Sequence, residues 1–204
     1  QHSAAAHPLV AYSDGACPLK DNKYYACLLV TKGKAGSYQG GSDNALKKLN
    51  DKTHSFVAAT STSGFAVPAG AIAKVNSVKV GDLQQGGGFF KKVLYGQSHP
   101  GSAVNLFNGD ADVAAFDDID LSQYGQFVND KSKPGADFKV SATAPAPLDA
   151  ARGKESIAIA AAQVQNEPLA VNAKAVSKAD QAKIVKALTA QSTTDNPRFF
   201  SKED

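Results

Sequence analysis

The segment AATSTSGFAVP (residues 58–68) sets four consecutive hydroxyl residues and a glycine between an apolar run and a helix-like pattern. Proline is tolerated only in the first turn of a helix, so Pro68 puts the start of the helix expected over residues 65–75 near residues 62–65. An N-cap needs a single Ser or Thr, so most of these hydroxyl groups are surplus. Ligands of α/β sheets bind beyond the carboxyl ends of strands, where the next helix begins. The segment therefore indicates either an over-supplied helix cap or a cradle in which backbone N–H groups and hydroxyls hold a tetrahedral oxyanion.

Strand-like and helix-like patterns alternate along the rest of the chain. We expect strands at residues 8–12, 23–32, 55–59, 89–95, 111–116, 138–142, 156–160 and 168–172, and helices at residues 42–50, 65–75, 98–109 and 177–189. This alternation predicts an α/β fold with a largely parallel sheet. The Gly-rich connector near residue 35 and the stretch near residues 125–145 are the expected boundaries between two lobes joined by crossing strands.

The amino-acid composition limits the classes of protein to which this chain can belong. A chain of 204 residues with 43% hydrophobic and 20% charged residues is long enough for one large domain or two small lobes. The formal net charge is only +3 and the basic residues are dispersed among acids, so the sequence lacks the footprint of a nucleic-acid-binding protein. No apolar run approaches the roughly 18 residues of a membrane span. The chain contains no methionine and begins QHSAAAHP, so we expect a processed, trimmed or partial product.

Two cysteines, Cys17 and Cys27, flank a segment in which Asp21 and Asn22 suit a turn. This spacing predicts a disulfide that closes a hairpin, which would stabilise the fold by roughly 2–3 kcal/mol and indicate an oxidising compartment. The alternatives are two unrelated buried thiols, or a thiol site for a metal or a soft anion.

A second segment, VLYGQSHPGSAVNLFNGDADVAAFDD (residues 93–118), repeats the pattern of a strand, a polar turn and a helix start. His99 alone is typical of a surface or capping residue, and Asp117 and Asp118 alone are typical of a solvated turn. Together they bring an imidazole and carboxylates to the sheet edge that carries the hydroxyl cluster.

Other classes of function find less support in the residues. The chain has no G-x-S-x-G elbow, no G-x-x-x-x-G-K-[ST] loop and no H-E-x-x-H helix. A hydrolase triad of His99, a serine and Asp117 or Asp118 is a minor alternative, because no base is specified for any one serine. A protein-interaction role would use Phe199 and Phe200 near the end of the chain, and a thiol-based sensor of soft oxyanions would need an unbonded cysteine.

Three segments resemble the second-lobe motifs of the phosphate, phosphite and phosphonate substrate-binding proteins of ABC transporters: TSTSGFAVP (60–68), LYGQSHPGSAV (94–104) and NGDADVAAFDD (108–118). The strand with Tyr24 and Tyr25, and the segments EPLAV (167–171) and AKIVKAL (182–188), are similar to the family's crossing strand and closing helix. The resemblance covers roughly residues 20–190 and implies a type II periplasmic-binding-protein fold, in which two α/β lobes close on a small oxyanion.

The resemblance also implies a set of ligand contacts. The hydroxyl residues at the helix start would hold ligand oxygens, His99 would donate to the same group, and an acid would accept a bond from a protonated ligand oxygen. A tyrosine would reach in from the hinge. An unpaired buried acceptor is costly, so the acid would select ligands that carry a proton. The implied contacts are Tyr24, Tyr25, Ser61, Thr62, Ser63, His99, Asp117 and Asp118, with no metal or cofactor.

The same resemblance implies a domain plan and a biological setting. Residues 1–34 would be a remnant of lobe one with the hinge strand, residues 35–140 lobe two with the anion site, and residues 141–204 the return to lobe one with the closing helix. Because family members are usually longer, we expect this chain to lack most of the first lobe, either as a fragment or as a shortened relative. A solute-binding protein of this kind works outside the cytoplasm, is not an enzyme, and delivers its ligand to an ABC permease.

Overall fold

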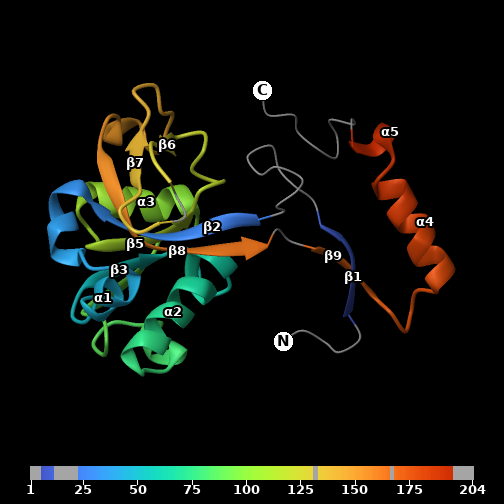
Figure 1. Cartoon of the computed structure of the whole chain (residues 1–204), viewed down its shortest axis with the longest axis horizontal. Coiled ribbons are helices and arrows are strands. Elements are labelled where there is room, and N and C mark those ends of the chain that lie inside the picture. Colours follow the sequence, from blue (N-terminus) through green and yellow to red (C-terminus); the bar gives the residue numbers. More distant parts are fainter. Residues whose placement is uncertain (1–5, 12–22, 131–132, 166–167, 195–204) are drawn as a thin grey trace. The chain divides into compact units, whose positions relative to one another are not determined.

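The computed structural model describes residues 6–11, 23–130, 133–165 and 168–194 (Figure 1). The chain divides into two compact units, one of residues 24–164 and one of residues 1–23 with 165–204. Residues 24–34 and 141–164 thus cluster with the larger unit, whereas the sequence placed boundaries near residues 34 and 140. The larger unit contains both polar segments that the sequence singled out.

A seven-stranded sheet with the strand order β4-β3-β5-β2-β8-β7-β6 forms the centre of the larger unit. Strand β3 is parallel to β4 and β5, while β5 pairs with β2, and β7 with β6 and β8, in antiparallel fashion. The strands are β2 (Lys23–Thr31), β3 (Thr53–Phe56), β4 (Lys92–Tyr95), β5 (Val113–Asp117), β6 (Gly125–Phe127), β7 (Asp137–Val140) and β8 (Glu155–Gln165).

The expectation of a largely parallel sheet is therefore wrong, because the sheet is mixed. Helical crossovers join β3 to β4 and β4 to β5, and such connections bring the next strand back in the same direction. No α-helix lies between β6 and β7 or between β7 and β8 in the described residues, and these strands pair antiparallel.

The helices of the larger unit begin and end at residues with clear local signals. Ser98 caps α3 (His99–Asn108), and Gly109, with φ 84°, ends it. Pro68 occupies the first turn of α2 (Val67–Asn76), as expected, and a π-helical turn, η2 (Thr62–Ala66), leads into that helix. The remaining helical segments are η1 (Lys32–Tyr38), α1 (Ser42–Lys47), η3 (Val80–Leu83) and η4 (Asp149–Ala151).

Two hydrophobic clusters pack against opposite faces of the sheet. Strand β5 is buried along its whole length, and its side chains alternate between the clusters, with Val113 and Ala115 in one and Ala114 and Phe116 in the other. Helices α1 and α2 cover the first face and α3 covers the second (Figure 1). The loops at the carboxyl ends of β3, β4 and β5 therefore share one edge of the sheet.

The smaller unit contains an antiparallel pair formed by β1 (Ala6–Ala11) and β9 (Pro168–Asn172). Helix α4 (Lys178–Leu188) contacts β1 and is followed by α5 (Gln191–Thr194). The side chain of Ser177 caps α4 by accepting a hydrogen bond from the backbone N–H of Asp180. None of the described helices has the length and apolar character needed to span a bilayer.

Candidate functional site

The hydroxyl cluster lies on the turn between β3 and α2. Ser61 has an extended backbone, and its Oγ accepts a hydrogen bond from the backbone N–H of Gly64 at 3.0 Å. The carbonyl of Ser61 accepts from the N–H of Ala66 at 2.9 Å, which closes the wider π-turn. The first N–H groups of a helix have no partner inside it, and Thr62 and Ser63 are the first two residues of this turn. Thr62 is exposed, whereas Ser63 is buried.

Gly64 has a packing role in this turn. A Cβ atom built on Gly64 would overlap the side chain of Val57, at the end of β3. The glycine therefore lets the turn fold back closely on the strand. This close approach also holds Ser63 over the end of the sheet.

Helix α3 brings His99 to the same edge. The Oγ of Ser98 accepts from the N–H of Gly101 at 3.1 Å, so His99 is the first residue of the helix. A buried polar network fixes the helix to β3: Ser102 Oγ donates to the carbonyl of Ser55 at 3.1 Å, and Asn105 Nδ2 donates to Ser55 Oγ at 3.0 Å. The imidazole thus has a rigid support on its own helix.

Ser63, His99 and Asp117 meet in one buried group, which we call the polar cluster. Ser63 Oγ donates to Asp117 Oδ2 at 2.9 Å and lies 3.5 Å from His99 Nε2. His99 Nε2 lies 3.2 Å from the same carboxylate oxygen. The three residues are only 4%, 9% and 6% exposed, respectively, so their interactions are shielded from solvent.

The hydrogen bond on the other side of the imidazole fixes its tautomer. The backbone N–H of Asp117 donates to His99 Nδ1 at 3.0 Å. A nitrogen that accepts a hydrogen bond carries no proton, so the proton of the neutral ring is on Nε2. The polar cluster therefore contains a neutral histidine whose Nε2–H faces a carboxylate.

Asp120 completes the surroundings of the imidazole. Its carboxylate Oδ2 lies 3.5 Å from His99 Nε2, and its backbone N–H donates to Asp117 Oδ1 at 2.8 Å. Our sequence reasoning missed Asp120. The signal was its position three residues after Asp117 in DDID, which suits a turn in which a carboxylate accepts from a later backbone N–H.

Burial raises the pKa of Asp117 above its ordinary value, against the hydrogen bonds from the Asp120 backbone and from Ser63. Asp118 is also buried, at 8% exposed, but the contacts with Ser63 and His99 come from Asp117. Successive side chains of a strand point to opposite faces, and Asp117 is the last residue of β5.

The donor atoms of His99, Asp117 and Asp120 lie within 4.8 Å of one another, close enough to hold a cation. A metal ion needs the lone pair of the ring nitrogen that faces it. Here Nε2 carries the proton, so the tautomer opposes coordination and favours hydrogen bonding to an acceptor.

The other candidate residues are only partly described. Tyr24 and Tyr25 lie in β2, but their side chains are outside the described part of the structure. Cys27 is fully buried in β2, while Cys17 lies outside the described residues. The disulfide between the two cysteines stays a prediction.

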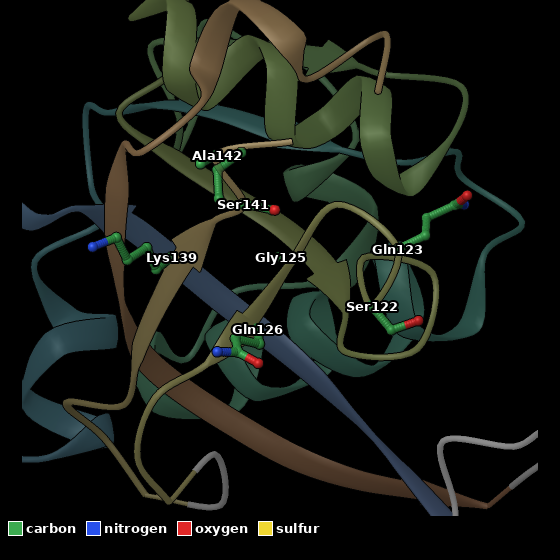
Figure 2. A pocket seen from close by; sticks show the side chains of 8 residues that line it. Ser122, Gln123, Gly125, Gln126, Lys139, Ser141 and Ala142 are labelled. Atoms are coloured by element: carbon green, nitrogen blue, oxygen red, sulfur yellow. The ribbon is translucent and has the colours of Figure 1, made fainter. Parts of the chain in front are cut away.

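Two cavities of similar volume lie on the larger unit. One, of about 410 Å³, is bounded by the loops after β3 and β4 and by the segment around η3. The other, of about 400 Å³, lies over β6 and β7 (Figure 2). In Figure 2 the ends of Lys139 and Gln123 point away from each other, so these polar groups do not converge on one ligand.

Comparison with known proteins gives the family. No curated protein sequence matches the chain. A binding-protein component of an ABC phosphonate transporter from Pseudomonas aeruginosa shares the fold, with a TM-score of 0.57 and 18% identity over 95% of this chain and 52% of that one. A Xanthomonas citri protein solved with bound ATP gives a TM-score of 0.58 and 16% identity over 96% of this chain and 62% of that one. The chain thus spans about half to three-fifths of the length of these neighbours.

The chain shares its fold with these neighbours, so the α/β binding-protein fold that the resemblance implied is confirmed. A family model described as "ABC transporter, phosphonate, periplasmic substrate-binding protein" matches residues 1–202. The chain therefore belongs to the family of phosphonate periplasmic substrate-binding proteins of ABC transporters.

Proposed function

We propose that this protein binds a small phosphorus oxyanion, namely a phosphonate, phosphite or phosphate, at the polar cluster and delivers it to an ABC permease. The observation that carries the proposal is the meeting of Ser63, His99 and Asp117 at the start of the helix that η2 and α2 form. Helix N-termini attract anions through their unpaired N–H groups and the helix dipole. The family match supports a phosphorus ligand.

The hydrogen-bond donors available to such a ligand are uncharged groups. They are the N–H groups of Thr62 and Ser63, the hydroxyl groups of the same turn, and Nε2–H of His99. The Oγ of Ser61 accepts a hydrogen bond as the cap, and its hydroxyl hydrogen can still be donated to a ligand oxygen. An incoming phosphoryl oxygen would take the hydrogen bonds that Ser63 and His99 now direct at Asp117.

Asp117 makes binding depend on whether the ligand carries a proton. With a neutral His99, the polar cluster holds a carboxylate and no compensating cation. A fully ionised ligand would place two anions side by side, whereas a P–OH group can donate to the carboxylate. We therefore propose that the site takes oxyanions that carry a proton and rejects those, such as sulfate, that carry none near neutral pH.

The wider setting is proposed on the same basis. Residues 24–164 are the proposed anion-binding lobe, and β1, β9 and α4 belong to the proposed other lobe. Tyr24 or Tyr25 would contact the ligand from β2. The family implies an extracytoplasmic protein that works with a membrane permease.

The hydrolase alternative has a specific difficulty. In a Ser-His-Asp triad the histidine is the base and directs a lone pair at the serine hydroxyl. The nitrogen nearest Ser63 Oγ is Nε2 of His99, and this nitrogen carries the ring proton. We therefore propose a binding protein rather than an enzyme. Phe199 and Phe200, on which an interaction role would rest, lie outside the described residues.

Calorimetric titration of the purified protein with methylphosphonate, phosphite, phosphate and sulfate tests the proposal. We expect binding of one or more of the three phosphorus oxyanions and none of sulfate. Ser63→Ala should lower the affinity by roughly ten- to a hundredfold, the value of a hydrogen bond to a charged group. Ser122→Ala, at the cavity of Figure 2, is the matched control and should change nothing.

Two results would contradict the proposal. One is the absence of binding to all three phosphorus oxyanions by the folded protein. The other is equal affinity in the wild type and in the Ser63→Ala variant, which would remove the polar cluster from the binding site.

A further inference from the structure

The cavity beside the polar cluster, which we call the amide hollow, has a volume of about 410 Å³. This volume is within the range of about 300–1,000 Å³ typical of small-molecule sites. Residues that line it include Ala58, Ala59, Gln84, Gln85, Tyr95 and Gln97. Ala59 stands two residues before Ser61, and Gln97 stands two residues before His99. The two loops that carry the polar cluster thus also form walls of the amide hollow.

The chemistry of the amide hollow is polar and uncharged. Three carboxamides and a phenol border it, with alanines on the side of β3, and no acidic or basic residue is among the described residues that line it. Each carboxamide both donates and accepts hydrogen bonds. Tyr95 Oη donates to the carbonyl of Gln84 at 2.9 Å and so fixes the segment after η3 to the end of β4.

Gln97 adds an independent observation. Its φ is 63°, in the left-handed region that glycine and asparagine adopt with least strain. Its backbone N–H donates to the carbonyl of Val57 at 2.9 Å, and that of Gly96 donates to the carbonyl of Phe56 at 2.8 Å, which holds the strained conformation. Strain of this kind at a cavity points to a side chain retained for binding.

We infer that the phosphorus ligand carries a neutral substituent that forms hydrogen bonds, such as a hydroxyalkyl or carboxamide group, and that the amide hollow holds this substituent. The inference rests on the proposed function, because it assumes that the phosphoryl group occupies the polar cluster. Inorganic phosphate would leave the amide hollow empty. A cationic substituent would find no carboxylate among the residues that line it, while a neutral polar one would find both donors and acceptors.

Three phosphonates that differ in their substituent provide the test: methylphosphonate, 2-hydroxyethylphosphonate and 2-aminoethylphosphonate. In calorimetric titrations of the purified protein, we expect the hydroxyethyl compound to bind at least tenfold more tightly than the methyl compound. The aminoethyl compound should bind no more tightly than the methyl compound.

The variant Gln97→Gly separates this role from a structural one. It removes the carboxamide and also relieves the left-handed backbone, so its unfolding temperature should be equal to or higher than that of the wild type. The preference for the hydroxyethyl compound should fall at least fivefold, while the affinity for methylphosphonate stays within twofold. Gln123→Ala, at the cavity of Figure 2, is the matched control and should keep the preference.

The outcomes distinguish the two proposals. Binding of methylphosphonate with no gain from the hydroxyl group would overturn the inference and leave the proposed function standing. Binding of none of the three phosphonates, in a protein that also fails to bind phosphite and phosphate, would contradict the proposed function and the inference with it. An equal loss of affinity for both compounds in Gln97→Gly would assign Gln97 to the fold and would also overturn the inference.

Discussion

A single backbone hydrogen bond governs the chemistry of the polar cluster. Because the N–H of Asp117 donates to His99 Nδ1, the imidazole stays neutral and presents Nε2–H to the ligand side. The charge balance of the proposed site thus depends on Asp117 and on the ligand.

The first prediction concerns the pH dependence of ligand binding. Above its second pKa the free phosphonate has lost its last proton, so the proposed complex must take up one proton on binding. The affinity for methylphosphonate should therefore fall as the pH rises, by up to about tenfold per pH unit. Asp117→Asn replaces the carboxylate by a neutral amide, so the fall should become shallower. Titrations at pH 6 and pH 8 check this, and an unchanged slope in the variant would contradict it.

The second prediction concerns His54, which lies in the core. The His54 ring stacks on Phe56 with centroids 4.0 Å apart, and neither ring nitrogen has a hydrogen-bond partner among the described residues. Burial lowers the pKa of His54 to about 3, from an ordinary value of 6.5. The unfolded chain then binds a proton that the folded one does not, so stability is lost as the pH falls from about 6.5 towards 3, by up to about 1.4 kcal/mol per pH unit.

His54→Leu removes the titrating group and keeps an apolar side chain of similar size. We expect the variant to lose less stability than the wild type between pH 7 and pH 5, as measured by urea unfolding at the two pH values. Equal losses in both proteins would show that His54 does not set the acid sensitivity.

At the level of elements, the junction of β4 and α3 positions His99. A Cβ atom built on Gly96 would overlap the backbone N–H of Ser102 and lie 2.7 Å from its Cα. Backbone atoms in the first turn of a helix cannot move aside as a flexible side chain can. Only glycine at this position lets β4 run so closely into α3.

The third prediction follows from this contact. Gly96→Ala should lower the free energy of unfolding by about 1–3 kcal/mol, as overpacking does elsewhere, and should weaken phosphonate binding because His99 is displaced. Gly70→Ala, in α2, is the matched control. Nothing lies within 4 Å of its added Cβ, so this variant should be more stable by about 0.5–1 kcal/mol. Thermal unfolding of both variants decides between these outcomes.

The residue at which a helix starts was easier to predict from the sequence than the way in which the strands pair with one another. Pro68, the Ser98 cap and the Ser177 cap act within one helical turn, and the helices that they mark are present. The expected strand at residues 89–95 begins only at Lys92, because Phe90 packs into the core from the preceding turn. Strand direction is set by pairing between distant segments, which local patterns do not encode.

For the candidate site, too, local signals could be predicted from the sequence and signals that depend on folding could not. The sequence singled out Ser63, His99 and Asp117, which the structure brings together, because surplus polar residues at helix starts and strand ends are visible locally. It did not single out Gln97 or Asp120. The signal for Gln97 is a backbone angle, which arises only in the folded chain, and that for Asp120 is the weak turn pattern of DDID.

At the scale of the whole molecule, the larger unit holds both hydrophobic clusters. Among the residues whose burial is described, the two clusters are drawn from residues 27–160, all within the larger unit. A segment of this size buries enough surface to fold alone.

The fourth prediction is that residues 23–165, which keep β2 and β8 whole, fold independently. Their thermal unfolding should be cooperative, with a midpoint within roughly 4 °C of the main transition of the full chain, since such a shift corresponds to about 1 kcal/mol. Circular dichroism in the near-ultraviolet range should show fixed aromatic packing. A broad transition without that signal would mean that the smaller unit is needed for the core.

The ends of the seven-stranded sheet have a further consequence for behaviour at high protein concentration. Its outermost strands, β4 and β6, hold only four and three residues, and β4 begins with the exposed Lys92. Short strands that carry lysine offer few open backbone groups to another chain. The sheet is therefore poorly suited to edge-to-edge aggregation or to capture of an extended peptide.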